Sequence, residues 1–186
     1  YDANKCGSGI TGGNLEWRGD CHTEDAAVPL KPMGEDYKGT NLSQEFIDAH
    51  RDILDPDGDG TIDVSGGMHD AGDHVKFCLP GSYAASTLGW GYYEFRDAYV
   101  DSGQQWHIED ILHWFNDYYL KCTYFDENGD ILAFCYQVGE GNIDHNYWNA
   151  PELQNESLLD FARPAYFATV ETPASDMCAG VAASLA

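Results

Sequence analysis

Apolar positions recur with the period of an α-helix in some stretches of this chain and show no period in others. Residues 42–54 place Leu42, Phe46, Ile47 and Leu54 near one face, which predicts a short amphipathic helix. Residues 1–40, rich in Gly, Asp and Pro, and residues 55–67, rich in Gly and Asp, lack such a period. Both stretches are predicted to be loops.

Longer helices are expected further along the chain. Residues 82–100 carry aromatic side chains nearly all round, which predicts a helix buried on every side. Residues 104–125 carry apolar side chains at helical spacing, and the Ala-rich residues 175–186 predict a further helix. The periodic set is Ile108, Ile111, Leu112, Phe115, Tyr118 and Tyr119. Trp90, Trp106 and Trp114 fall within these helices and are predicted to belong to the core.

A turn signal interrupts the helical pattern at residues 127–130, Glu-Asn-Gly-Asp, because Asn-Gly favours positive φ. It separates residues 122–125 from residues 131–136, so a short β-hairpin is expected there. Another loop begins at residues 139–141. Helices joined by long loops predict an all-α architecture whose chemistry lies on the loops.

Composition narrows the range of partners. The chain has 186 residues, enough for one domain or part of a larger one. Its net charge of −23 repels phosphate backbones and anionic lipids, so we expect neither nucleic acid nor a membrane surface as a partner. No apolar run reaches the roughly 18 residues of a membrane-spanning helix. A neutral ligand such as a polysaccharide, or a cation such as Ca²⁺, suits this field.

The segment around Asp70 and Asp73 carries the strongest chemical signal. These two carboxylates lie three residues apart on a stretch made pliable by Gly66, Gly67 and Gly72. A turn of this kind can direct both side chains at one water molecule, which one carboxylate can deprotonate. The spacing alone also fits an Asp-rich turn whose side chains cap the following helix.

The motifs around this loop resemble those of glycoside hydrolase family 9, whose members are mostly β-1,4-glucanases. The similarity rests on Ser-Gly-Gly at 65–67 followed by Asp-Ala-Gly-Asp-His-Val-Lys-Phe at 70–77. Further motifs follow the family order: Trp-Arg-Gly-Asp at 17–20, Ile-Leu-His-Trp at 111–114, Val-Gly-Glu-Gly-Asn at 138–142 and Arg-Pro at 163–164. The resemblance implies that residues 1–186 are the N-terminal half of an (α/α)6 barrel with long functional loops, a partial catalytic domain truncated at both ends.

The resemblance also implies a mechanism. Asp73 matches the family's general base and Asp70 its partner in holding the water, for hydrolysis of β-1,4-glucosidic bonds in cellulose or related β-glucans with inversion. An inverting site needs an acid roughly 6.5–9.5 Å from the base on the other face of the sugar. Asp70 shares a tight loop with Asp73 and is not suited to that role. The family's acid is a Glu that lies beyond this chain, so we expect residues 1–186 alone to be inactive.

Four residues that follow the loop beginning at residues 139–141 are candidate substrate contacts. His145 and Trp148 match family positions that line the sugar subsites, and Tyr147 and Asp144 are weaker candidates. An indole face packs on the apolar face of a glucose ring, while an imidazole reaches a hydroxyl. From the residues alone, a core Trp and a capping His remain the alternative.

Residues 55–63 resemble the first nine positions of an EF-hand loop. Oxygen ligands would come from Asp55, Asp57, Asp59, Thr61 (through its backbone) and Asp63. The twelfth position is Gly66 instead of a bidentate Glu, so an ordinary EF-hand is excluded. We expect calcium here, with a solvated acidic turn as the alternative.

A zinc site is a second metal candidate. Cys6, Cys21 and His22 resemble part of a zinc site found in some family members. Tetrahedral zinc needs a fourth ligand. The family members with this site have a His three residues after the base, where this chain has Lys76, and the nearby Cys78 is the candidate substitute. A Cys6–Cys21 disulfide or free thiols are the alternatives.

The resemblance further implies a secreted, extracellular protein that acts on β-glucan and carries accessory carbohydrate-binding or cellulosomal modules. Two rivals remain open at this stage. A non-catalytic carbohydrate-binding domain would keep the aromatic residues but needs no paired aspartates, and a calcium-binding structural module leaves the other motifs unexplained.

Overall fold

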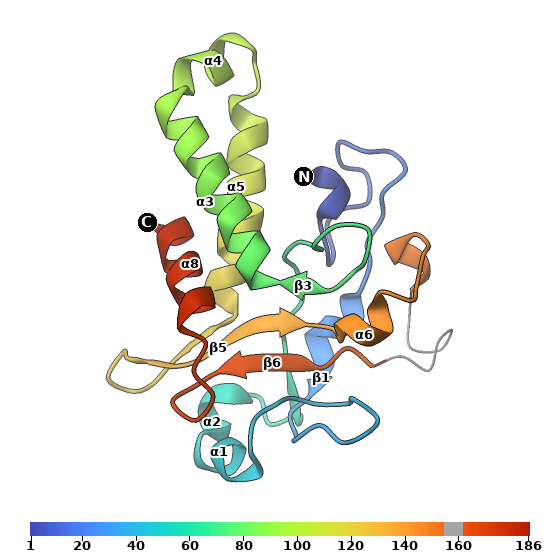
Figure 1. The fold of residues 1–186 in the computed structure, drawn as a ribbon, viewed down its shortest axis with the longest axis vertical. Helices are drawn as coiled ribbons and strands as arrows, with labels where there is room; N and C mark the ends of the chain where they lie inside the picture. Colours follow the sequence, from blue (N-terminus) through green and yellow to red (C-terminus); the bar gives the residue numbers. More distant parts are fainter. Residues whose placement is uncertain (155–161) are drawn as a thin grey trace.

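A computed structural model of the chain describes residues 1–154 and 162–186 (Figure 1). The main helices are α1 (Gln44–Ala49), α2 (Arg51–Leu54), α3 (Cys78–Glu94), α4 (Arg96–Asp101), α5 (Gln105–Lys121), α6 (Gly141–Asp144) and α8 (Ser175–Leu185). Short 3₁₀ helices are η1 (Asp2–Asn4), η2 (Thr23–Ala27) and η3 (Pro151–Leu153). The strands are β1 (Val28–Pro29), β2 (Thr61–Ile62), β3 (Lys76–Phe77), β4 (Thr123–Phe125), β5 (Ile131–Val138) and β6 (Ala165–Ala168).

A four-stranded antiparallel sheet corrects the prediction of an all-α chain. The central strand β5 pairs with β3 and β4 along one edge and with β6 on the other. The predicted hairpin is confirmed: β4 and β5 flank a turn in which Gly129 has a φ of +84°. The longer pairing with β6 joins residues far apart in sequence, which a local turn signal cannot reveal.

The helix expected over residues 42–54 is two helices. Ser43 begins α1 because its Oγ accepts a hydrogen bond from the Phe46 amide at 3.0 Å. The chain breaks at His50 and resumes as α2, while Phe46, Ile47 and Leu54 still enter the core. The predicted α5 and α8 are confirmed, and Ile108, Ile111, Phe115, Tyr118 and Tyr119 form the buried face of α5.

The predicted burial of residues 82–100 is wrong for this chain. Helix α3 packs against α5 and α8 and then extends away from the sheet toward α4 (Figure 1). Its aromatic residues therefore stay open: Tyr83 is 75% exposed, Trp90 72% and Tyr93 83%. Trp106 is also 56% exposed, so among the three Trp residues assigned to the core, Trp114 alone is partly buried.

The sheet explains how two loops come together. Strands β3 and β5 are antiparallel, with Lys76 opposite Val138. The loop that precedes β3, with Asp70 and Asp73, therefore lies at the same end of the sheet as the segment that follows β5, with His145.

In the described parts of the chain, no helix is long and apolar enough to cross a membrane.

Candidate active site

The acidic loop closes on itself just before β3. The Asp70 amide donates a hydrogen bond to the Val75 carbonyl at 3.0 Å. Asp73 is only 9% exposed, whereas Asp70 is open to solvent. Partial burial and the neighbouring Asp73 charge both raise the pKa of Asp70. The structure thus brings the two predicted catalytic residues together.

His145 lies directly against Asp73. Its Nε2 is 2.9 Å from Oδ2 of Asp73, and its side chain is 57% exposed. Among the described residues, this buried Oδ2 has no partner with hydrogen-bond geometry. Sequence reasoning assigned His145 to the sugar and missed this contact with the candidate base. The contact follows from the β3–β5 pairing and has no local signal in the sequence.

Trp148 lies over the acidic loop. A Cβ added at Gly72 would be 3.2 Å from the indole ring, so the absence of a side chain at this position lets the ring approach the loop backbone. The rest of the indole is open, and the residue is 85% exposed. An exposed indole beside two carboxylates can serve as a platform for a sugar ring.

A hollow of about 330 Å³ opens beside Asp70. Its lining includes residues of the first half of α3 together with Met68 and His69. Its lining is mostly apolar and aromatic, including Tyr1, Phe77 and Tyr83. A carboxylate at the rim of an aromatic hollow is an arrangement suited to binding a neutral, hydroxyl-rich ligand.

The two weaker substrate candidates take different places. The Tyr147 ring contacts the His74 ring at a centroid distance of 5.7 Å, and its hydroxyl donates to the Ala150 carbonyl at 3.3 Å. Asp144 is 0% exposed, and its carboxylate accepts a hydrogen bond from the His74 amide at 2.7 Å. A ligand in an open cleft therefore has no access to Asp144 in this structure.

Three separate segments assemble a cluster of side chains of the types that can bind a metal ion. Backbone hydrogen bonds join Gly7 to Cys21 in both directions at 3.0 Å, and the Cys6 amide to the Gly67 carbonyl at 2.9 Å. The His69 amide also donates to the Asn4 carbonyl at 2.7 Å. These bonds bring the side chains of Cys6, Cys21, His22 and His69 within 4.8 Å of one another, measured between their ligand atoms.

His69 corrects the expected fourth zinc ligand. Lys76 instead pairs with Asp25 at 2.9 Å, and Cys78 lies in the core. All six cysteines fall within the described residues and are free thiols, so the Cys6–Cys21 disulfide is absent. Sequence reasoning missed His69 although it directly precedes Asp70.

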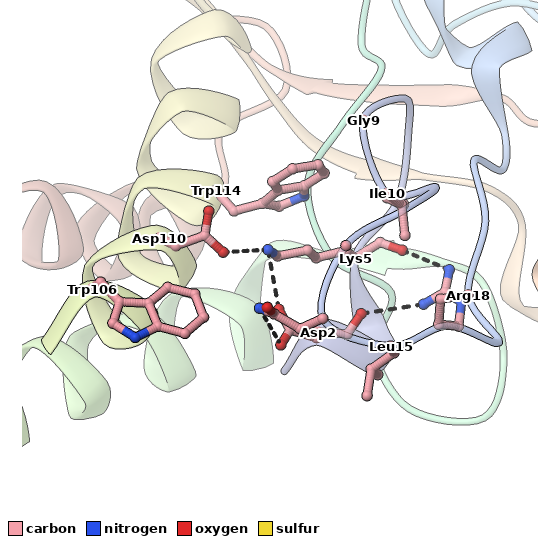
Figure 2. Close-up of a pocket in the computed structure, with 11 residues that line it drawn as sticks. Asp2, Lys5, Gly9, Ile10, Leu15, Arg18, Trp106, Asp110 and Trp114 are labelled. Atoms are coloured by element: carbon pink, nitrogen blue, oxygen red, sulfur yellow. Dashed lines mark hydrogen bonds and ion pairs between the residues drawn. The ribbon is translucent and has the colours of Figure 1, made fainter. Parts of the chain in front are cut away.

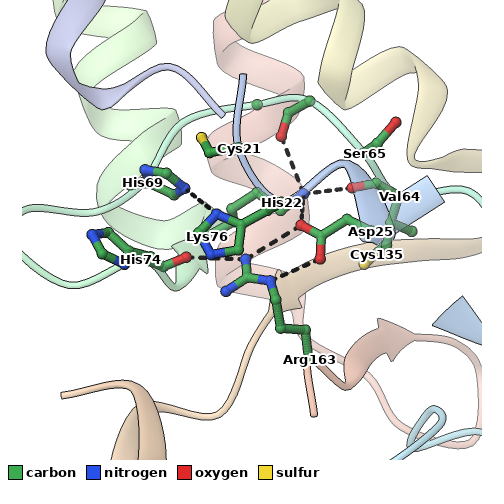
Figure 3. Close-up of polar contacts among 12 residues, drawn as sticks. Cys21, His22, Asp25, Val64, Ser65, His69, His74, Lys76, Cys135 and Arg163 are labelled. Atoms are coloured by element: carbon green, nitrogen blue, oxygen red, sulfur yellow. Dashed lines mark hydrogen bonds and ion pairs between the residues drawn. The ribbon is translucent and has the colours of Figure 1, made fainter. Parts of the chain in front are cut away.

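The donor set fits a tetrahedral cation. His69 Nε2 is 3.2 Å from His22 Nδ1 (Figure 3), close to the separation of about 3.3 Å expected when two nitrogens share a zinc ion. Burial lowers the pKa of His69 to about 4 and that of His22 to about 2, so both rings are neutral near pH 7. Gln154 Oε1 lies 3.0 Å from the other nitrogen of His22 and holds the ring orientation.

Arg18 holds the segments that carry Cys6 and Cys21 through hydrogen bonds. Its guanidinium donates to the carbonyls of Ala3 and Lys5 and to Cys21 Sγ. Figure 2 shows Arg18 at one side of a second hollow, where Lys5 lies 2.5 Å from Asp110. The residues lining that hollow come from the N-terminal loop and α5, so it is separate from the acidic loop.

The predicted calcium loop gathers part of its ligand set. Oxygens of Asp55, Asp57 and Asp59 lie within 4.8 Å of one another. Asp55 is 5% exposed, and its buried Oδ1 has no hydrogen-bond partner in the described part of the chain. Asp63 is not part of this group of carboxylates, and its Oδ1 lies 2.7 Å from Lys121 Nζ. Thr61 donates through its amide and hydroxyl to Asp59.

Comparisons with known proteins identify the family of this chain. The family model described as "Glycosyl hydrolase family 9" matches residues 1–186. Endoglucanase 4 of Bacillus sp. (strain KSM-522) is 32% identical over 186 residues, which is 100% of this chain and 23% of that protein. The chain thus spans about a quarter of the length of this curated relative.

Solved structures give the same picture. The catalytic domain of Clostridium thermocellum CelT superposes with a TM-score of 0.90 at 52% identity, covering 99% of this chain and 36% of that one. The cellulase Cel9M of C. cellulolyticum in complex with cellobiose gives a TM-score of 0.68 at 35% identity, covering 99% and 34%.

Proposed function

This chain belongs to glycosyl hydrolase family 9, and from that membership we propose that the protein hydrolyses β-1,4-glucosidic bonds in cellulose or a related β-glucan. In this proposal Asp73 is the general base that takes a proton from water. Asp70 shares the task of holding that water. The reaction proceeds by single displacement with inversion at the anomeric carbon.

The observation that carries the proposal is the placement of Asp70 and Asp73 on one closed loop beside an aromatic hollow. Two neighbouring carboxylates can orient a water molecule and accept its proton. Trp148 supplies an exposed indole beside that loop, and His145 contacts Asp73. Cel9M, similar in structure, was solved with cellobiose. A sugar bound on Trp148 would lie next to Asp73.

The stereochemistry of the product tests this mechanism. NMR of the fresh product of the full-length protein should show the α-anomer first, because water attacks the face opposite the leaving group. Retention of the β-configuration would overturn the assignment of Asp73 as base. Binding of cellulose without any hydrolysis would instead favour the rival carbohydrate-binding domain.

We also propose that Cys6, Cys21, His22 and His69 hold a zinc ion with a structural role. The support is the Cys2His2 donor set, the burial of all four residues and the 3.2 Å separation of His69 Nε2 and His22 Nδ1. Burial raises the pKa of Cys6 to about 12, and a bound cation would bring this thiol to the thiolate form. Four protein ligands leave no open position for chemistry.

Calcium is proposed for the loop of residues 55–59. The support is the buried Oδ1 of Asp55, which has no hydrogen-bond partner among the described residues while Oδ2 accepts one from the Gly60 amide at 3.1 Å. A buried acceptor without a partner is costly. Asp57 and Asp59 add two further carboxylates. We further infer that residues 1–186 contribute the N-terminal half of an (α/α)6 barrel in a secreted enzyme with accessory modules.

A further inference from the structure

Next to the acidic loop lies a buried cluster of four charged side chains, of which Figure 3 shows Asp25, Lys76 and Arg163; the fourth is Asp144. Asp25 and Asp144 are 0% exposed, Lys76 is 1% exposed and Arg163 7%. Two cations balance two carboxylates, as buried ions require. Buried ion pairs are often no more stabilising than apolar residues of the same size, so stability alone does not explain this cluster.

Arg163 is held in one orientation by Asp25. Its Nε donates to Asp25 Oδ1 at 2.7 Å and its Nη2 to Oδ2 at 3.3 Å, a two-pronged pairing that fixes the guanidinium plane. Lys76 Nζ reaches the same carboxylate at 2.9 Å. Burial alone would raise the pKa of Asp25, but Arg163 and Lys76 outweigh burial and hold that pKa well below its usual range.

The cluster contacts the acidic loop at two consecutive peptide groups. Asp144 Oδ1 accepts a hydrogen bond at 2.7 Å from the His74 amide, which belongs to the peptide bond that joins Asp73 to His74. Arg163 Nη2 donates to the His74 carbonyl at 3.0 Å. Both side chains come from far along the sequence, 70 and 89 residues away from His74.

The side chain of His74 is held from the same direction. Its Nδ1 lies 2.5 Å from Gln154 Oε1, and Gln154 Nε2 donates to Asp144 Oδ2 at 3.2 Å. The loop itself has no regular secondary structure, and its internal support is the bond between Asp70 and Val75. The direction of the Asp73 side chain therefore depends on how the backbone of His74 is held, as well as on the contact of its carboxylate with His145.

We propose that Asp144 and Arg163 are positioning residues for Asp73, acting together as a clamp on the two peptide groups of His74. This inference rests on the proposed role of Asp73 as general base. Neither residue touches substrate in this scheme, because both are buried behind the loop. The clamp fixes the line along which the Asp73 carboxylate faces the attacking water. A displacement of about 1 Å in such a site can cost about 10²-fold in rate.

The test compares Asp144→Ala with the conservative Asp144→Asn in the full-length protein, with Asp97→Asn on the exposed helix α4 as matched control. Asp144→Ala removes the acceptor of the His74 amide, so we expect kcat to fall about 100-fold with KM within about threefold of wild type. Asp144→Asn keeps an acceptor for the His74 amide, so its kcat should be at least about tenfold higher than that of Asp144→Ala. Asp97→Asn should leave both constants unchanged.

Amide hydrogen exchange gives a readout that does not depend on hydrolysis. The His74 amide should exchange slowly in the wild type and much faster in Asp144→Ala, while amides of β5 keep their wild-type rates. Faster exchange with an unchanged kcat would overturn the positioning role. Unchanged exchange would overturn the clamp, and so would a fall in activity that only follows the fraction of unfolded protein.

The two proposals fail in distinguishable ways. If the wild-type protein hydrolyses no β-glucan, the proposed function fails and the positioning role fails with it, although the exchange result still shows whether Asp144 holds His74. If the wild type is active and Asp144→Ala matches it in kcat, the further inference alone is overturned. Arg163→Lys provides a second variant that keeps the buried charge but loses the forked geometry, with Arg96→Lys as its control.

Discussion

At the scale of single residues, Asp73 is the side chain whose loss should matter most. Replacement by Asn keeps the size and hydrogen-bonding shape of the side chain but removes the proton acceptor. General base catalysis is worth about 10²–10⁴-fold, so we expect kcat of the full-length Asp73→Asn protein to fall by that factor. Cellulose binding, measured by sedimentation with the polysaccharide, should stay near wild type. Unchanged hydrolysis would show that another group is the base.

A second residue-scale prediction concerns His69. Replacement of His69 by Ala should reduce bound zinc from about one ion per chain to a small fraction, because a tetrahedral site loses one of its four ligands. Metal content by mass spectrometry of the purified protein measures this directly. Cys178→Ser, a change outside the cluster, is the control and should keep its zinc. Full metal content in His69→Ala would exclude this ligand set.

Residue positions were predictable only where the reason is local. Asp70 and Asp73 come together because they share one short loop. Asp144 and His145 are neighbours in sequence, yet successive side chains of a helix such as α6 diverge by about 100°. Asp144 is therefore buried, while His145 is exposed and contacts Asp73. His69 joins the metal cluster through backbone pairing of distant segments, which no spacing rule contains.

At the scale of elements, the loop between α2 and β2 carries its own prediction. Calcium bound to the folded loop alone would stabilise the protein by about 2.7 kcal/mol at 100 times its Kd. EGTA should therefore lower the Tm of the full-length protein by a few degrees, and calcium added back should restore it. Asp57→Ala should show the lowered Tm without EGTA and no recovery with calcium.

The control for this loop is Asp101→Ala at the end of α4, which should respond to EGTA and calcium as the wild type does. Calorimetry that detects no heat of calcium binding in the wild type would contradict the site. The comparison of variants matters because EGTA also removes zinc, and only a calcium-specific recovery separates the two metals.

Elements were predictable from the sequence to different degrees. The period of α5 and the Ala-rich α8 follow from local pattern, and the Asn-Gly turn predicted the β4–β5 hairpin. Strand β6 and the short β3 depend on partners far along the chain. The aromatic pattern of α3 indicates a helix suited to burial on all sides, but it does not say whether the covering partners are within residues 1–186.

The exposed side of α3 sets the expectation for the whole molecule. Tyr83, Trp90 and Tyr93 on α3, and Phe95 just after its end, are each at least two-thirds exposed, which is unusual for large aromatic side chains gathered in one region. The curated relative named above is about four times as long as this chain. Residues 1–186 expressed alone should therefore associate or aggregate, as judged by light scattering.

Activity of the same piece tests the proposed chemistry. Inversion needs two carboxyl groups on opposite faces of the scissile bond. Asp70 and Asp73 share one short, closed loop and are therefore expected on the same face of that bond, and the family's general acid is expected beyond residue 186. Without that acid the leaving group departs unprotonated, so residues 1–186 alone should not cleave soluble cellulosic substrate, while the full-length protein should. A cooperatively folding monomer of residues 1–186 that cleaves such a substrate would place the acid within this chain.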